Sequence, residues 1–319
     1  MSLSRNGERE FMTHCLHIHG TSPDNHYWPY SGSRMVPIWL LFLSVVLLMG
    51  TSSCGVFSMN DTIPTAIPTS SPTPPPSSPL FHGPDNAMAL IPSGIFQMGH
   101  KEGLFGENVI IHTVSLNEFY MDVHEVTNAS YAQCVSAGEC QPPSENDSYT
   151  RSVYYDNPAY ADYPVIYVDW DAAQTYCQWR GARLPTEAEW EKAARGCLDG
   201  QDFPWGNSEP VCDVGVPNGA QFNDCRPTDT VAVGQFAPNG YGLYDVAGNI
   251  MEWVSDWYNR TYYASSPSEN PTGPDSGTYR VLRGGSWMDS NYFFLVAYRR
   301  RASADIRSFD IGFRCARSQ

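Results

Sequence analysis

Residues that favour turns occur along almost the whole chain, and they limit the fold to short elements. The 319 residues include 26 glycines and 25 prolines, and asparagine, aspartate and serine fill many of the intervals. Such dense punctuation argues against a helical bundle. The chain is nevertheless long enough to bury one large core. We therefore predict many short elements that are joined by ordered loops.

The chain is strongly acidic, with a formal net charge of -15 and a sequence pI of about 4.8. Proteins that bind nucleic acid usually carry basic surfaces, so we expect no nucleic-acid partner. An acidic surface favours solubility and has some affinity for hard cations.

Residues 1–54 contain an N-terminal extension followed by a segment typical of export signals. The run from Met35 to Met49 is nearly all apolar, Arg34 stands before it, and small residues lead to Cys54. The run is short for a membrane span, which needs roughly 20 apolar residues. We predict lipidation at Cys54 and a location on the extracytoplasmic face of a membrane; an uncleaved anchor is the alternative. The polar residues 1–33 favour a true translation start at Met35.

A linker rich in proline, serine and threonine spans residues 55–85. Its central part, Ile63–Pro79, cannot bury a core and favours the extended polyproline II conformation. We predict that it holds a folded domain, residues 86–317, away from the membrane.

Two segments near the start of this domain have the alternating pattern of strands. Residues 89–99 alternate around a Pro-Ser-Gly turn, which predicts a hairpin. Residues 114–122 alternate again and predict a further strand.

Three segments have the spacing and end signals of helices. They span residues 127–137, 168–179 and 186–195. In the last, Thr186 and Glu189 form a capping-box pattern and Gly196 follows as a stop signal. Beyond Gly196 we expect only short strands and long loops.

A series of short motifs resembles the formylglycine-generating enzyme family, also called the sulfatase-modifying factor family. The motifs follow the family order over about 230 residues, which makes the resemblance specific. It implies an α+β domain related to C-type lectins, with three main helices, short strands and long ordered loops. The matching segments are Ile91–Gly94, Met98–Gly99, Glu125–Asn128, Pro164–Val165, Ala172–Trp179, Arg183–Glu191, Pro204–Asn207, Pro238–Asp245, Gly248–Asn249, Glu252–Trp253, Arg283–Trp287 and Gly312–Cys315.

The segment after Arg283–Trp287 departs from the family pattern. Active oxidases of the family carry two copper-binding cysteines there, and this chain has Asp289 and Phe294 at the matching positions. Because copper(I) prefers soft thiolates, we do not expect copper to bind. Met251 also replaces a tryptophan that family oxidases often carry. The remaining candidates for a role in the family cleft are Ser286, Asp289 and Tyr292.

Calcium is the cofactor that the resemblance implies. The ligands would be the side chains of Asp245 and Glu252 and the backbone carbonyls of Gly248 and Ile250. Two carboxylates around a Gly-Asn turn suit a hard cation, which takes 6–8 oxygen ligands. Without the resemblance, the same residues would indicate a capped turn before a strand.

Nine cysteines in an exported chain predict disulfides. The resemblance implies a bond between Cys177 and Cys315. Two other pairs, Cys134 with Cys140 and Cys212 with Cys225, bracket short loops. Cys197 has no assigned partner and could replace Cys212 or Cys225.

These observations favour an exported module that binds a peptide, glycan or partner protein without oxidase activity. Two alternatives stay open. One is a formylglycine-generating oxidase that acts on a sulfatase cysteine; the other is a different enzyme that uses the same cleft. The arginines near the C-terminus, such as Arg299–Arg301, Arg307 and Arg314, are expected to pair with carboxylates.

Overall fold

The computed structural model describes residues 81–82, 87–100 and 110–319. The predicted export segment and most of the predicted linker lie outside these residues. Within the described ranges, no helix has the length and apolarity that a membrane span requires. Strand β1 lies before residue 86, where we predicted the folded domain to start.

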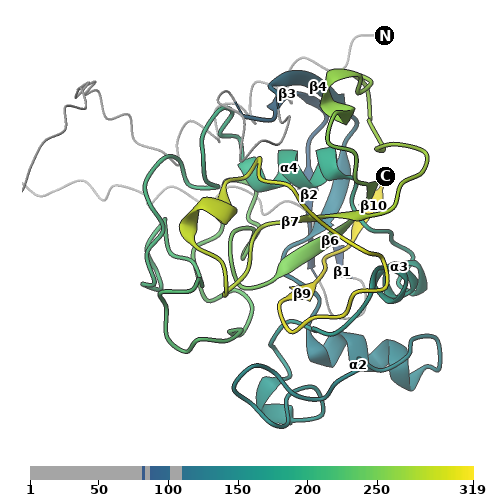
Figure 1. Cartoon of the computed structure of the whole chain (residues 1–319), viewed down its shortest axis with the longest axis vertical. Coiled ribbons are helices and arrows are strands. Elements are labelled where there is room, and N and C mark those ends of the chain that lie inside the picture. The colour runs from purple at the N-terminus through teal and green to yellow at the C-terminus, as the bar shows by residue number, and fades with distance from the viewer. Residues whose placement is uncertain (1–80, 83–86, 101–109) are drawn as a thin grey trace, which may run out of the picture. The chain divides into compact units, whose positions relative to one another are not determined.

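The strands of the described residues form three small sheets (Figure 1). The first is antiparallel and has the order β1-β2-β5-β10, whereas the second pairs β3 with β4. The third has the order β8-β7-β6-β9, with β9 parallel to β6. The strands are β1 (Phe81–His82), β2 (Ala87–Ile91), β3 (Gly94–Met98), β4 (His112–Leu116), β5 (Phe119–Asp122), β6 (Met251–Trp257), β7 (Arg280–Arg283), β8 (Arg300–Ala302), β9 (Ile311–Gly312) and β10 (Ala316–Ser318).

Each of the three α-helices in the described residues is short and begins at a side-chain cap. The caps are Thr127, Asp169 and Thr186, whose side chains accept hydrogen bonds from the first turns. The predicted capping box of Thr186 and Glu189 is present in both directions. All three predicted helices are thereby found, within a residue or two of their expected ends. They are α2 (Asn128–Ser136), α3 (Trp170–Trp179) and α4 (Glu187–Arg195).

The two strand predictions near the start of the domain need correction. Residues 89–99 do not form a hairpin, because β2 pairs with β1 and β5 whereas β3 pairs with β4. The turn after Ile91 therefore carries the chain from one sheet to another. Residues 114–122 form two strands rather than one, since β4 ends at Leu116 and β5 begins at Phe119. Alternation shows which face is buried and does not identify the partner strand.

Two apolar clusters make up most of the core. The first lies between the β2–β5 region and α4, and Trp190 is buried within it. The second joins α2 and α3, which lie side by side in Figure 1, to the middle of β6. Trp253 of β6 is fully buried in this second cluster. The sheet β8-β7-β6-β9 is thus packed on the helices, and the segment after β7 starts from a rigid support.

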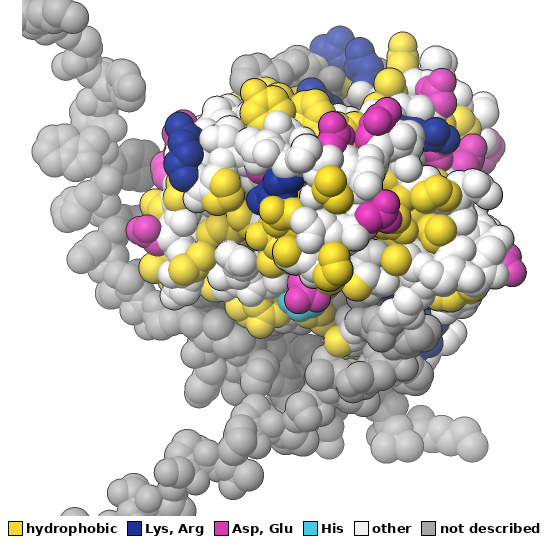
Figure 2. All heavy atoms as spheres, turned by 90° about the horizontal axis from the view of Figure 1, so that it is seen from below, with side chains coloured by type: hydrophobic (Ala, Val, Ile, Leu, Met, Phe, Trp, Pro, Cys, Tyr) yellow, Lys and Arg dark blue, Asp and Glu magenta, His cyan; other side chains and the backbone are white. Residues whose placement is uncertain are grey.

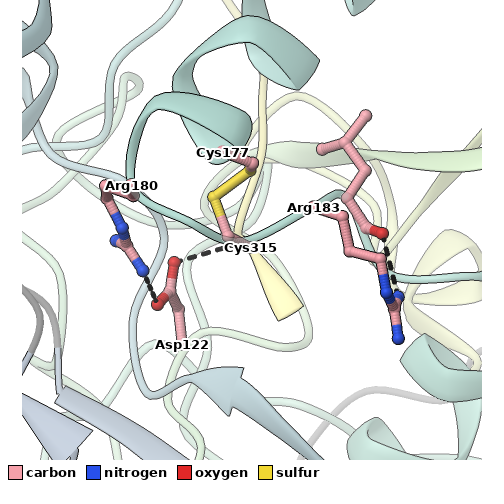
Figure 3. Close-up of a disulfide and its surroundings, with 6 residues drawn as sticks. Asp122, Cys177, Arg180, Arg183 and Cys315 are labelled. Carbon is pink, nitrogen blue, oxygen red and sulfur yellow. Dashed lines mark hydrogen bonds and ion pairs between the residues drawn. A yellow bond between two sulfur atoms is a disulfide. The ribbon is translucent and has the colours of Figure 1, made fainter. Parts of the chain in front are cut away.

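Disulfides tie distant parts of the domain together. The structure contains bonds between Cys177 and Cys315, Cys134 and Cys140, and Cys212 and Cys225, which are the pairs that the sequence suggested. Cys197 is disulfide-bonded as well and displaces neither Cys212 nor Cys225. Figure 3 shows the first bond between α3 and the chain just before β10.

A buried ion pair lies beside that disulfide. Arg180 donates to Asp122 Oδ1 at 2.6 Å, and the backbone N–H of Cys315 donates to Asp122 Oδ2 at 2.9 Å (Figure 3). Both side chains are almost completely buried. The pair and the disulfide together fix α3 against β5 and the C-terminal strand.

Candidate functional site

The turn after β7 holds the segment in which active oxidases carry their cysteines. Gly284 and Gly285 have φ values of 94° and 69°, a region that favours glycine. A Cβ on Gly285 would lie 2.4 Å from a ring carbon of Phe294. The two glycines therefore allow the chain to reverse closely over that ring.

Asp289 accepts three hydrogen bonds, two from Ser286 in this turn and one from Arg300 of β8. Its Oδ2 accepts from the backbone N–H of Ser286 at 3.0 Å and from the Ser286 hydroxyl at 2.9 Å. Its Oδ1 accepts from Arg300 at 3.1 Å. Both carboxylate oxygens are engaged, so Asp289 acts here as a cap of the turn and as the partner of an arginine.

Ser286 lies between two carboxylates. Its hydroxyl oxygen is 3.3 Å from Asp310 Oδ2, in addition to its bond to Asp289. Burial raises the pKa of Asp310, and the charge of Asp289 adds to that rise. Ser286 is fully buried, and its hydroxyl joins the two acids.

Phe294 occupies the second position at which oxidases carry cysteine. Its side chain is 1% exposed and packs edge-to-face against Phe222, with the ring centroids 5.9 Å apart. It belongs to a small apolar cluster that also contains Phe203 and Cys225. The position is filled by hydrocarbon, which leaves no soft ligand there.

Tyr292, the third cleft candidate, and Met251, which replaces the family tryptophan, lie beside other side chains. The ring of Tyr292 packs against Phe293 and Tyr298. Met251, in place of the tryptophan, is buried, and its sulfur lies 3.6 Å from a guanidinium nitrogen of Arg300.

An aromatic cluster borders the Ser286 turn, and the sequence analysis missed it. Tyr149, Trp287 and Phe309 lie with ring centroids 5.1 to 5.8 Å apart. Tyr149 is 60% exposed and Met288 is 45% exposed, whereas Trp287 is buried. The indole N–H of Trp287 has no hydrogen-bond partner among the described residues. No local motif marks Tyr149, which comes from a loop about 140 positions away in the sequence.

The predicted calcium ligands lie close to a buried ion pair. Both oxygens of Glu252 accept from Arg314 at 2.7 to 2.9 Å, and one also accepts from the Trp190 indole at 2.8 Å. Glu252 is thereby neutralised by an arginine in the structure, which the sequence did not suggest.

Asp245, unlike Glu252, has one carboxylate oxygen without a hydrogen-bond partner among the described residues. Its Oδ2 accepts from the backbone N–H of Gly234 at 2.6 Å, whereas its Oδ1 is buried without a partner among the described residues. Burial raises the pKa of Asp245 to about 6 and raises that of the neighbouring Glu125 well above the usual range. In the described part of the chain, no three acidic, histidine or cysteine side chains converge as a metal site. Calcium at this turn stays a prediction, with Asp245 as its best-placed side chain.

Gly248 of the same turn is required by packing. It has a φ of 87°, and a Cβ there would lie 2.4 Å from the Gln221 carbonyl oxygen. The turn between Asp245 and Ile250 is therefore pressed tightly against the neighbouring loop.

The C-terminal arginines pair largely as predicted. Arg299 binds Glu187, Arg300 binds Asp289, and Arg307 binds Asp169. The guanidinium groups of Arg301 and Arg317 lie over tyrosine rings.

The fold and the turn after β7 define an α+β domain with the formylglycine-generating enzyme fold. Among solved structures, PvdO from Pseudomonas aeruginosa is similar with a TM-score of 0.63 and 26% identity. Treponema denticola variable protein 1 gives the same values, and each comparison covers 75% of this chain and 98% of the other. The family model of the sulfatase-modifying factor enzyme 1-like domain matches residues 77–319, and the chain belongs to this family.

Relatives with this domain differ in what their names state. The formylglycine-generating enzyme of Streptomyces coelicolor is 34% identical over 277 residues, which cover 71% of this chain and 87% of the relative. The "Inactive C-alpha-formylglycine-generating enzyme 2" of Mus musculus is 32% identical, with 75% and 88% covered. The "Serine/threonine-protein kinase pkn1" of Chlamydia pneumoniae is 36% identical, but the chain spans only 38% of its length. Family membership is therefore compatible with more than one function.

Proposed function

We propose that this domain is a non-oxidase member of the family that binds a peptide, glycan or partner protein. The binding surface would be the turn after β7 together with the aromatic cluster at its edge. One observation carries the proposal: Asp289 and Phe294, which replace the two cysteines, are both committed to other roles. Asp289 is hydrogen-bonded through both oxygens, and Phe294 is buried in an apolar cluster.

Thiol chemistry has no other support in the described residues. The cysteines from Cys134 to Cys315 are all disulfide-bonded. A two-coordinate copper(I) site needs a preorganised pair of soft ligands. The oxidase also needs a thiolate that exchanges with the substrate cysteine. Neither requirement is met by an aspartate and a buried phenyl ring.

Binding is favoured by the exposed apolar groups beside the turn. Tyr149 and Met288 expose apolar surface beside the turn, and aromatic and methionine side chains are enriched at interfaces. On the face that Figure 2 shows, charged side chains of both signs are scattered among apolar ones. That face offers no extended basic surface for nucleic acid.

The test is a copper titration of the purified chain together with an assay on a Cys-x-Pro-x-Arg peptide. We expect neither copper binding nor conversion of the substrate cysteine to an aldehyde. Mass spectrometry that found copper-dependent aldehyde formation would overturn the proposal and support an oxidase. A copper-independent change in the peptide would support a different enzyme in the same cleft.

The double variant Asp289→Cys/Phe294→Cys sharpens this test. It restores both thiols, and Asp289→Ala/Phe294→Ala is its matched control, since it removes the same side chains without adding sulfur. Copper binding in the first variant alone would mean that the two substitutions are what removed the metal. If neither binds copper, the surroundings, including Met251, have diverged as well.

We also propose that calcium stabilises the turn from Asp245 to Ile250, and that the chain is exported and anchored at a membrane. The unpartnered Asp245 oxygen supports the first, and the abundance of disulfides supports the second. Cell fractionation of the wild type and Cys54→Ala tests the anchor. If the variant stays in the membrane fraction, the apolar segment is an uncleaved anchor and lipidation at Cys54 is not required.

A further inference from the structure

The chain contains four triplets of the form Asn-X-Ser/Thr in which X is not proline, and they begin at Asn60, Asn128, Asn146 and Asn259. In exported proteins this triplet is the acceptor pattern for N-linked glycans, on surface loops. Asn60 lies outside the described residues. Because so short a pattern also arises by chance, the structure has to decide which of the other three asparagines is able to accept a glycan.

The triplet at Asn128 is closed off by packing. Asn128 is the first residue of α2 and is 2% exposed, and its Nδ2 donates to the Tyr160 carbonyl oxygen at 2.9 Å. The hydroxyl of the triplet belongs to Ser130, which is buried as well. A sugar on this nitrogen would therefore have to displace the start of α2 from the domain.

The triplet at Asn146 lies at the surface, but its polar groups are engaged. The Nδ2 of Asn146 donates to Asp156 Oδ2 at 2.9 Å, and its Oδ1 accepts from the backbone N–H of Asp156 at 2.9 Å. Ser148 is 6% exposed and donates to Asp229 at 2.7 Å. Since the acceptor pattern requires the hydroxyl, a buried Ser148 makes this triplet a poor acceptor in the folded domain.

The triplet at Asn259 has the opposite character. It lies on the connection between β6 and β7, and Asn259, Arg260 and Thr261 are all exposed. The Oδ1 of Asn259 accepts from the backbone N–H of Thr261 at 2.8 Å and from its hydroxyl at 3.0 Å, which is an Asx turn. The Nδ2 makes no hydrogen bond with the described residues. The amide nitrogen and the hydroxyl are thus presented together at the surface.

The contacts that hold this turn to the domain do not involve the amide nitrogen. The backbone carbonyl oxygen of Asn259 accepts from Arg299 Nη1 at 3.2 Å and from the backbone N–H of Tyr262 at 3.3 Å. Replacing one hydrogen on Nδ2 by a sugar therefore breaks no contact among the described residues. The turn has a fixed base and an open amide, which are the two properties that the triplets at Asn128 and Asn146 lack in combination.

We propose that Asn259 carries an N-linked glycan. The proposal rests on the proposed export of the chain, because the sugar donor is a polyprenyl-pyrophosphate-linked oligosaccharide that a membrane transferase uses during export. In the transfer, the Nδ2 of Asn259 forms a bond with the anomeric carbon of the sugar. The bond from that carbon to the phosphate oxygen breaks, the lipid pyrophosphate leaves with the electron pair, and the amide proton passes to a base of the transferase.

The experiment uses the full chain, isolated from cells of the organism that encodes it. Protease treatment of intact cells first shows whether the domain is exported. Mass spectrometry of intact glycopeptides then maps each triplet, and we expect a glycan at Asn259 and none at Asn128 or Asn146. Thr261→Ala, expressed in the same cells, should lose the glycan at Asn259. Thr261→Ser is the matched control; it retains the hydroxyl and should retain the glycan.

Three results would overturn Asn259 as the acceptor without touching the export proposal. They are an exported chain with unmodified Asn259, a glycan at Asn128 or Asn146 in its place, and a glycan at Asn259 that persists in Thr261→Ala. A chain that is not exported would overturn the glycan and the export proposal together. The copper and peptide tests of the binding function are independent of all these outcomes.

Discussion

Removing the Cys177–Cys315 disulfide should destabilise the domain more than removing the Cys134–Cys140 or the Cys212–Cys225 disulfide. The two cysteines are 138 positions apart, whereas Cys134 and Cys140 are 6 apart. A crosslink restricts the unfolded chain more when it closes a longer loop. On the chain-entropy model, loops of these lengths correspond to about 5 kcal/mol and about 2 kcal/mol at 25 °C.

The comparison is fair because both pairs are buried. All four cysteines are at most 4% exposed, so replacement by alanine leaves a similar small cavity in each case. The longer loop has a second effect, because the bond positions Cys315, whose N–H donates to Asp122. Loosening that contact leaves the buried Asp122–Arg180 pair less well held, which adds to the loss.

The assay is urea unfolding of the wild type and of the two double variants, followed by tryptophan fluorescence. We expect Cys177→Ala/Cys315→Ala to lose about 3 kcal/mol more than Cys134→Ala/Cys140→Ala. A loss of that size is a large part of the free energy of unfolding of a typical domain, which is roughly 5–15 kcal/mol. Equal losses in the two variants, or a larger loss in the short-loop variant, would refute the loop-length reasoning.

Three further predictions concern buried charges. Burial and the charge of Glu187 raise the pKa of Asp256 from 3.8 to about 7. Between these values the carboxyl group is protonated in the folded state and ionised in the unfolded state. The free energy of unfolding should therefore fall as pH rises from about 4 to about 7. The urea midpoint of Asp256→Asn should fall less over this pH range than that of the wild type. If both midpoints fell equally steeply with pH, Asp256 would not be the group responsible. Chelation of calcium should lower the Tm of the wild type and not that of Asp245→Ala; equal shifts would place the ion elsewhere. Glu252→Gln should cost about 3–5 kcal/mol with or without chelator, because Arg314 is left buried and unpaired; a loss that vanished in chelator would instead make Glu252 a calcium ligand.

Local signals in the sequence were sufficient for the helices. Thr127, Asp169 and Thr186 each cap the helix that follows, and a cap acts within three or four residues. The pairing of strands was not predictable in the same way. The turn after Ile91 has hairpin composition, yet the strands on either side of it belong to different sheets. Which strand lies next to which depends on contacts made far along the chain.

The candidate site, too, could be predicted from the sequence only where the signal is local. The motif that contains Ser286, and the replacement of cysteine at Asp289 and Phe294, could be read from the sequence. The links from Ser286 through Asp289 to Asp310 and Arg300 could not, because they join separate segments. The partner of Glu252 was missed for a related reason. Arg314 lies 62 positions away, and only the fold brings its guanidinium to that carboxylate.

The motif that carries the family resemblance consists largely of residues that hold the fold. Arg283 is fully buried and donates to Glu191 of α4 at 2.5 Å. Gly285 allows the close approach of Phe294, and Ser286 bonds Asp289. The Arg283–Glu191 contact does not involve positions 289 and 294, and the other two contacts are made by the replacing residues themselves, so the turn is held without a thiol. A match to this motif is therefore a match in folding, and the chemistry depends on two positions outside it. The domain can keep its architecture and still lack the reaction, which is why positions 289 and 294 decide between an oxidase and a binding module.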